Sequence, residues 1–362
     1  MKKDCAFTLR STAVMLVALA CSLAAVAQEA DGFNRRGNIL ISDQFNNRVL
    51  EVNPANHEIV WSFGDGSSVA GPHSVVAVND AQRVGSLTLV AGTGAPAGSE
   101  PTCSSPCQDN RVMLVAPDRQ IIWQYGQTGV PGSGPNQLNT PVQSTWIPIR
   151  DTRPSTTFIP DGHVLITDQV NERIIEVTLD KKIVWQYGMT GTSGCGFNQL
   201  NNPNSAELLP NGHILISDEN NSRVIEVNRA KQIVWSYGSC TGTQLNIVAF
   251  ASRLPNGNTL ITDSGNNRIL EVDSYGNPVW SYVTNARMGS VSNPNPTRAV
   301  RLRNGNTLIS DQFNHQVIEV DGMGNIVFQQ GTIAVSGTTF DLLNAPYDAK
   351  VIGDYTGLTP PF

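Results

Sequence analysis

Short apolar runs of five or six residues recur along the chain and are separated by turn-forming residues. The first kind of run ends in aspartate and covers positions 38–43, 163–168, 213–218, 258–263 and 306–311. A second run follows after a short turn, at positions 48–52, 173–177, 223–227, 268–272 and 316–320. A third run contains an aromatic residue, at positions 59–64, 183–188, 233–238, 278–282 and 326–331. The Ile-Leu-Ile style runs do not alternate with polar residues, so they predict strands that are buried on both faces between neighbouring blades.

The runs belong to one long repeat. A degenerate sixth copy fits the gap at 87–91, 111–115 and 121–126. The residues that anchor the third runs are spaced 62, 62, 50, 45 and 48 positions apart, and they are Trp61, Trp123, Trp185, Trp235, Trp280 and Phe328. A further strand precedes each set of three, as at 203–209, 249–254 and 296–302. Four strands at this period, in six copies, predict an all-β fold, a six-bladed β-propeller of four-stranded blades.

The two ends of the repeat predict how the ring closes. The first run begins at Ile39, so the first blade lacks its innermost strand. The segment 346–352 resembles the innermost strand at 203–209 and has no blade of its own. We therefore expect the C-terminal strand to complete the first blade, because a closed ring leaves no blade unpaired to its neighbours.

The N-terminus has the features of an export signal. Basic residues precede an apolar stretch at 11–27 that ends in Ala-Val-Ala, which predicts cleavage after Ala27. This divides the chain into a signal peptide, 1–27, and one propeller domain, 28–362, that is secreted or periplasmic. Two alternatives are a single anchor helix and a lipoprotein acylated at Cys21. No other stretch is long and apolar enough to span a bilayer, so no membrane span is expected in the mature chain.

Composition and charge exclude several classes of protein and one class of partner. The chain has 40% apolar and 15% charged residues, 32 Gly and 21 Pro, which excludes a coiled coil, a disordered tail and a multi-span membrane protein. Without residues 1–27 it keeps 21 basic and 29 acidic side chains, a net charge of −8. An acidic exported protein lacks the basic face that nucleic acids require, so no nucleic-acid partner is expected.

Four cysteines remain in the mature chain, an even number that predicts two disulfides in an oxidising compartment. Three pairings are compatible with the sequence. Cys103 and Cys107 lie in one insertion and would close its loop. Cys195 and Cys240 lie in successive loops between blades and would bridge neighbouring blades.

The repeat resembles that of the NHL family of six-bladed propellers. The residues that carry the resemblance are 197–203, the Asn211-Gly212 turn, the Asp-x-x-Asn-x-Arg stretch at 218–223 and the aromatic end at 235–238. The resemblance covers essentially the whole mature chain. It implies the fold, and it leaves the function open, since one fold hosts many functions. The Ile-Val-Trp-x-Tyr strand ends are also similar to those of secreted arylsulfotransferase-like propellers.

Polar residues that recur in most blades are interpreted as scaffold. The Asp of each first run is followed three positions later by Asn, as in Asp218 and Asn221, and five equivalent copies favour a turn motif over a metal site. The Arg and Glu of four second runs, as in Arg223 and Glu226, lie three apart on a strand and therefore face opposite sides. We expect each Arg to meet a neighbouring blade rather than its own Glu.

Polar residues that break the repeat are the candidates for function. The innermost strands line a central channel, and their first positions are polar and differ from blade to blade. The candidate ligand-binding ring at this mouth is His73, Gln143, Asn204, Arg298, Tyr347 and Asp348. Two alternatives to a ligand-binding ring are a water-filled mouth without a ligand and a purely structural ion pair between Arg298 and Asp348.

The first functional hypothesis is an exported binding module that takes a small molecule or a protein at this loop-rich mouth. The alternative is an enzyme that uses the channel, with His73, Arg298 and Asp348 as catalytic candidates. It would be either a His-dependent, arylsulfotransferase-like enzyme or a metal-assisted lyase or lactonase. Resemblance to propeller lactonases implies calcium held by oxygen ligands, for which Asn204, Glu207 and Asp348 are the candidates. A third hypothesis is a purely structural envelope protein.

Overall fold

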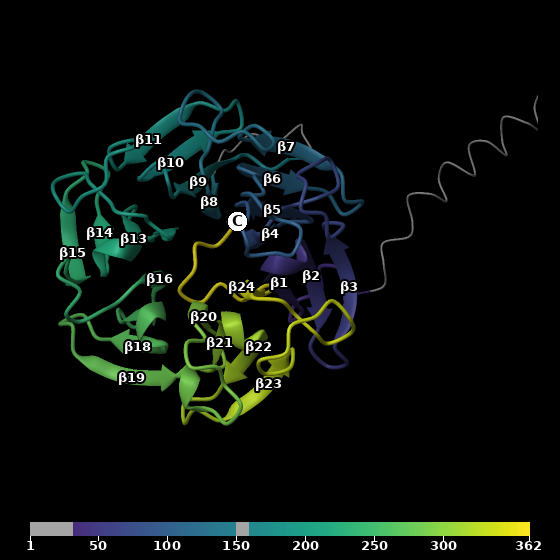
Figure 1. Ribbon diagram of the computed structural model, residues 1–362. Coiled ribbons are helices and arrows are strands. Elements are labelled where there is room, and N and C mark those ends of the chain that lie inside the picture. The colour runs from purple at the N-terminus through teal and green to yellow at the C-terminus, as the bar shows by residue number, and fades with distance from the viewer. Residues whose placement is uncertain (1–31, 150–158) are drawn as a thin grey trace, which may run out of the picture.

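The computed structural model describes residues 32–149 and 159–362, and in these residues 24 strands form six four-stranded antiparallel sheets around a central axis (Figure 1). The predicted six-bladed propeller is thereby confirmed. The predicted signal peptide, 1–27, lies outside the described residues. Among the described residues, no helix is long and apolar enough to cross a membrane.

Each blade runs from an inner strand beside the axis to an outer strand at the rim. Blade 1 consists of β24 (Pro346–Val351), β1 (Ile39–Asp43), β2 (Arg48–Asn53) and β3 (Glu58–Phe63). Blade 2 consists of β4 (Val78–Val84), β5 (Leu87–Gly92), β6 (Arg111–Val115) and β7 (Ile121–Tyr125). Blade 3 consists of β8 (Pro141–Pro148), β9 (Gly162–Asp168), β10 (Arg173–Thr178) and β11 (Ile183–Tyr187).

The other three blades follow in chain order. Blade 4 consists of β12 (Ser205–Leu208), β13 (Ile214–Asp218), β14 (Arg223–Val227) and β15 (Ile233–Gly238). Blade 5 consists of β16 (Val248–Arg253), β17 (Thr259–Asp263), β18 (Arg268–Val272) and β19 (Pro278–Val283). Blade 6 consists of β20 (Pro296–Arg301), β21 (Thr307–Asp311), β22 (Gln316–Val320) and β23 (Ile326–Gln330). Single-turn 3-10 helices in the described chain are η1 (Gln44–Asn46), η2 (Glu219–Asn221), η3 (Ser264–Asn266), η4 (Thr284–Ala286) and η5 (Gln312–Asn314).

The ring closes as predicted. The C-terminal strand β24 pairs antiparallel with β1, with Ala349 opposite Ile41 and Val351 opposite Ile39. The closing blade therefore combines strands from both ends of the described chain, and separating those ends would expose the backbone groups of both strands.

The core lies between blades rather than in a single layer. Between blades 3 and 4, for example, Leu165 and Ile174 pack with Ile216 and Ile225, all of which are buried. The middle strands therefore bury side chains on both faces, which explains why their sequence runs do not alternate.

The repeated aspartates stabilise turns, as interpreted from the sequence. Asp168 Oδ2 accepts from Asn171 Nδ2 at 2.8 Å and from Arg173 Nε at 2.7 Å, and its Oδ1 accepts the backbone N–H of Asn139 at 2.8 Å. The same set recurs at Asp43, Asp218 and Asp263. As expected, the Arg does not pair with the Glu of its own strand, but its main partner is corrected here. It is the Asp directly opposite on the adjacent strand of the same blade, because cross-strand neighbours are close. The same Arg also reaches the loop that arrives from the preceding blade, as where Arg223 Nη2 donates to the carbonyl of Gln199 at 3.2 Å.

Two blades replace this motif with different residues at equivalent places. In blade 6, Gln316 stands where the other blades have Arg, and the guanidinium of Arg287 from the preceding loop binds both Asp311 and Gln316. In blade 2, Gly92 stands where the others have Asp, and the carboxylate of Asp109 fills that space. A Cβ on Gly92 would lie 2.5 Å from Asp109 Oδ2.

A second repeated device joins neighbouring blades, and we call it the interblade staple. It consists of a Glu on the third strand of one blade, an Arg at the end of the inner strand of the next, and the outer-strand Trp over which that Arg lies. In the staple between blades 5 and 6, Arg301 Nη2 is 2.7 Å from Glu271 and the guanidinium carbon is 4.9 Å from the Trp280 ring centre. The other staples of this kind are Glu51–Arg83–Trp61 and Glu226–Arg253–Trp235.

The interface between blades 2 and 3 replaces the staple with apolar residues. Leu114 stands at the Glu position, opposite Trp123 on the adjacent strand, and Trp146 stands at the Arg position. All three pack in one buried cluster. Glu and Arg are thus lost together, which keeps a single buried charge from being left without its partner.

Both disulfides form, and the structure decides the pairing that the sequence left open. Cys103 bonds to Cys107 within the insertion of blade 2, with Cα atoms 5.6 Å apart. Cys195, in the β11–β12 loop, bonds to Cys240, in the β15–β16 loop, with Cα atoms 6.4 Å apart. The second bond ties together the two loops that flank blade 4.

Candidate functional site

The inner strands surround a channel with two different ends. We call the end at which the inner strands begin the upper mouth, and the opposite end the lower mouth. The 3-10 turns η1, η2, η3 and η5 lie at the upper mouth, because the start of each inner strand pairs with the end of the strand that precedes the turn. Pro346, for example, is opposite Asp43, which immediately precedes η1.

The inner strand of blade 2 begins later than the sequence predicted, so His73 does not start it. In β4, Val78 is opposite Gly92, as Pro141 is opposite Asp168 in blade 3. His73 is exposed in the β3–β4 loop, and Asn79 occupies the place predicted for it. Pro72 resembled the proline that begins other inner strands, whereas Ala81, the small residue shared by most of them, marks the true register.

A set of polar side chains encircles the upper mouth, and we call it the mouth ring. Four come from the inner strands or directly before them, and four come from the turns after the second strands. They are Asn79, Asn204, Thr297, Tyr347, Gln44, Gln169, Glu219 and Gln312. Of the predicted ligand-binding residues, Asn204 and Tyr347 belong to this ring. The turn residues were missed, although they share one sequence signal: each directly follows the repeated Asp, and three of the four are Gln.

One chain of contacts in the mouth ring crosses the channel. The amide of Asn204 in blade 4 lies 2.8 Å from the hydroxyl of Tyr347 in blade 1, and these blades face each other across the axis (Figure 1). Asn204 Nδ2 also donates to Glu219 Oε2 at 2.7 Å, and Gln169 Nε2 donates to the same oxygen at 3.0 Å. The Asn204–Tyr347 contact is therefore a crossbar over the channel.

A second chain of contacts runs along the other side of the ring. Gln312 Nε2 donates to Gln44 Oε1, and Gln44 Nε2 donates to Asn79 Oδ1, each at 2.8 Å. These amides link blades 6, 1 and 2. Each amide keeps further donor and acceptor capacity, because a primary amide carries two N–H groups and an oxygen with two lone pairs.

Two ionisable groups of the mouth ring have shifted titration. Burial raises the pKa of Glu219 to about 7, and hydrogen bonds from Asn204 and Asn202 oppose this shift. Burial also raises the pKa of Tyr347, and the nearby Glu219 carboxylate raises it further. Tyr347 is therefore a neutral hydroxyl at physiological pH, and Glu219 exchanges its proton near neutrality.

Below the crossbar the channel is filled by a buried cluster of charges. Arg298 Nε lies 2.9 Å from Asp348 Oδ1, and Arg298 Nη2 lies 2.8 Å from Asp80 Oδ1. Lys350 Nζ lies 2.7 Å from Asp80 Oδ1 and also pairs with Asp348. The ion pair suggested for Arg298 and Asp348 is thus present within a larger network. Because these charges neutralise one another, Arg298 does not present a free cation to the upper mouth.

The lower mouth is closed by the last residues of the described chain. Residues 352–362 follow β24 and return to the axis, where the C-terminus is drawn at the centre of the ring (Figure 1). Thr359 Oγ1 donates to Glu207 Oε2 at 2.6 Å, and the other oxygen of Glu207 accepts from Gln143 Nε2 at 2.8 Å. Gln143, which was predicted to line the upper mouth, therefore binds Glu207 nearer the lower mouth instead.

The residues proposed as calcium ligands are bound to different partners. Asn204 contacts Tyr347 and Glu219, Glu207 binds Thr359, and Asp348 pairs with two cations. Calcium would need these contacts to break. Among the described residues, no group of three or more His, Cys, Asp or Glu is placed to hold a metal ion. As placed, these residues do not fit a calcium site, and no step below depends on one.

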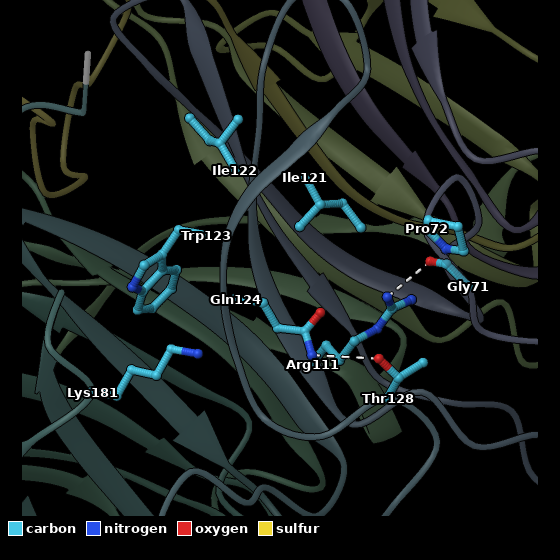
Figure 2. Close-up of a pocket in the computed structure, with 9 residues that line it drawn as sticks. All are labelled: Gly71, Pro72, Arg111, Ile121, Ile122, Trp123, Gln124, Thr128 and Lys181. Carbon is cyan, nitrogen blue, oxygen red and sulfur yellow. Dashed lines mark hydrogen bonds between the residues drawn. The ribbon is translucent and has the colours of Figure 1, made fainter. Parts of the chain in front are cut away.

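A cavity of about 600 Å³ lies outside the channel, against the outer strand of blade 2 (Figure 2). Trp123 and Lys181 line it, together with Arg111, whose Nη1 donates to the carbonyl of Gly71 at 2.9 Å. Arg111 also pairs with Asp109, so its charge is already neutralised. We assign no function to this cavity, because Arg111, its one buried charged side chain among the described residues, is held by contacts that serve the fold.

Fold and site together define a propeller with a polar upper mouth, a charged interior and a closed lower mouth. No protein-family model matches the chain, and no curated protein matches it. Among solved structures, a protein of unknown function from Bacteroides caccae is 15% identical with a TM-score of 0.53, over 82% of this chain and 93% of that one. A streptogramin B lyase is 12% identical with a TM-score of 0.51, over 83% of this chain and 80% of that one. At these identities the likeness supports the propeller fold alone.

Proposed function

We propose that the protein is an exported binding module whose upper mouth takes a small, neutral ligand rich in hydroxyl or amide groups. The observation that carries the proposal is the chemistry of the mouth ring. Five of its eight members are amides, two carry hydroxyl groups, and one is a carboxylic acid. The mouth ring therefore offers many groups that can both donate and accept hydrogen bonds, and it contains no cationic side chain.

Charge complementarity favours a neutral ligand over an anion. The guanidinium of Arg298, below the crossbar, is already shared between Asp80 and Asp348. Glu219 is the single acid of the mouth ring, and an anionic ligand would raise the cost of its ionisation. Hydroxyl and amide groups can instead take up the remaining hydrogen-bonding capacity of Gln44, Asn79 and Gln312 without a charge to desolvate.

Three features support export and a relation to the NHL family. The two disulfides are typical of an oxidising compartment. The predicted signal peptide, 1–27, would deliver the chain there. The blade motif, in which Asp218, Asn221 and Arg223 hold one turn together, matches the resemblance found in the sequence. We include membership of that family and a periplasmic or secreted location in the proposal.

The test is calorimetric titration of the purified protein with neutral mono- and disaccharides and with N-acetylated, amidated tripeptides. We expect saturable binding by one of these classes, weakened in Asn204→Ala and Tyr347→Phe. Tyr275→Phe is the matched control, because Tyr275 is 91% exposed on the β18–β19 hairpin. Failure of every probe to bind at millimolar concentration, or equal binding by Asn204→Ala, would refute the proposal.

A second candidate is an enzyme that works by acid–base chemistry, without a metal. It rests on Glu219, whose pKa of about 7 suits a general base, and on the neutral Tyr347 hydroxyl beyond the shared Asn204. Lyase or lactone-opening reactions are the class that such a pair serves. Turnover of simple lactones and esters that disappears in Glu219→Gln would favour this candidate, and a lack of turnover leaves the binding module.

A further inference from the structure

The tail, residues 352–362, occupies the lower mouth in the manner of a bound peptide. It begins as a continuation of β24, with the N–H of Ile352 donating to the carbonyl of Asn38 at 2.8 Å. It then crosses the underside of blades 6 and 5, where the backbone N–H of Arg303 donates to Asp354 at 2.7 Å. It ends at the axis, inside the ring formed by the inner strands (Figure 1).

Thr359 is the residue of the tail that the channel recognises in most detail. Its N–H and its hydroxyl both donate to Glu207 Oε2, at 2.8 and 2.6 Å. Its Oγ1 lies 2.9 Å from the backbone N–H of Leu208, and its carbonyl accepts from Gln82 Nε2 at 3.2 Å. Every polar atom of this threonine therefore has a partner on blade 2 or blade 4, whereas the tail itself extends from blade 1.

The residues on either side of Thr359 are also compatible with binding in the lower mouth. Leu358 is 7% exposed and packs in the apolar cluster that includes Phe250 and Leu302. Pro360 and Pro361 have no backbone N–H, so these two residues bring no unpaired donor into the channel. The recognised sequence is thus an apolar residue, a threonine and two prolines.

The walls of this site are held in place by contacts that do not involve the tail. Gln82 Oε1 accepts the N–H of Trp146 at 2.8 Å, and Gln143 Oε1 accepts the N–H of Ala206 at 2.8 Å. Gln143 also fixes the second oxygen of Glu207. Removing the tail would therefore leave a shaped site with one buried carboxylate oxygen unpaired, and such an atom favours a new donor.

We propose that the lower mouth is a peptide-binding site for a Leu-Thr-Pro-Pro segment, which the protein's own tail fills, and that a separate peptide of this sequence takes the tail's place once the tail is released. The site differs from the upper mouth in its residues and in its end of the channel. It does not depend on the function proposed above.

The test uses fluorescence anisotropy with a dye-labelled peptide of residues 355–362. The full-length protein should not bind it, because the site is filled. The full-length variant Leu358→Ala/Thr359→Val, whose tail is loosened, and a chain that ends at Thr356 should bind it saturably with one peptide per protein. A peptide with Thr359→Val should bind about tenfold more weakly or worse, since a hydrogen bond to a charged group is lost, and a peptide with Thr359→Ser should retain most of the affinity.

Three results would overturn the proposal. The first is no peptide binding by a variant that still melts cooperatively, and the full-length double variant decides this if the shortened chain does not fold. The second is equal affinity for the Thr359→Val peptide. The third is equal peptide binding by the unaltered full-length protein, which would place the peptide elsewhere on the surface.

Discussion

Tyr347 and Asn204 touch across the channel, 143 positions apart in the chain, with the phenol oxygen 2.8 Å from the side-chain amide nitrogen. Tyr347 lies on the strand that closes the ring, and Asn204 directly precedes the inner strand of the facing blade. The crossbar therefore forms only when β24 has paired with β1 and closed the ring. It separates the polar upper mouth from the buried charges of Arg298, Asp80 and Asp348.

The crossbar should contribute measurably to stability. Tyr347→Phe removes the hydroxyl and leaves the Asn204 amide with one partner fewer, so we expect the free energy of unfolding to fall by about 1 kcal/mol. Urea denaturation followed by tryptophan fluorescence measures this change. The exposed Tyr275→Phe is the control and should change the midpoint little. Equal midpoints for wild type and Tyr347→Phe would show that the contact does not form in solution.

The raised pKa of Glu219 should make stability depend on pH in a defined direction. The folded state keeps the Glu219 proton up to a pKa of about 7, whereas the ordinary value is 4.5. The folded state thus binds more protons than the unfolded state between these values, and stability falls as the pH rises through this window. The unfolding free energy of wild type minus that of Glu219→Gln should therefore decrease from pH 4.5 to pH 7. A difference that stays constant or increases contradicts the burial of Glu219.

The interface between blades 2 and 3 should reject a charge unless the whole staple is installed. Leu114→Glu places a carboxylate at a fully buried position that lacks a guanidinium, and we expect a loss of about 3 kcal/mol or more. Adding Trp146→Arg supplies the missing guanidinium at the position equivalent to Arg301, so the double variant should be more stable than Leu114→Glu alone. Urea denaturation of the three variants, with Trp146→Arg as the matched single, measures the coupling. A double variant no more stable than Leu114→Glu would show that the two positions do not meet.

Gly92 and Asp109 should behave as a coupled pair. Gly92→Ala adds a Cβ that collides with the Asp109 carboxylate, so it should destabilise blade 2 by about 1–3 kcal/mol. The exchange Gly92→Asp/Asp109→Gly restores the arrangement of the other blades and should recover most of that loss. Thermal melts of both variants test the pair. If Gly92→Ala is as stable as wild type, Asp109 does not occupy this space.

The positions that repeat were predictable, because each blade solves the same local problem with the same residues. The strands, the closure by β24 and the turn role of Asp168 and Asn171 all follow from a pattern that recurs every 45 to 62 residues. The start of β4 was not predictable from Pro72. Its register is decided where Gly92 lies opposite Val78 and leaves room for Asp109, a contact between segments that no repeat describes.

The sequence by itself thus determined the blades, their order and the closure of the ring, since these depend on local hydrophobic patterning and on turn residues. Only the tertiary structure decided what lies in the channel. Glu219 and Tyr347 come from facing blades, and Thr359 reaches Glu207 by a path across the underside. Such contacts depend on the curvature of the closed ring, which sets the distances between residues that are far apart in the chain. This curvature produces no periodic pattern in the sequence.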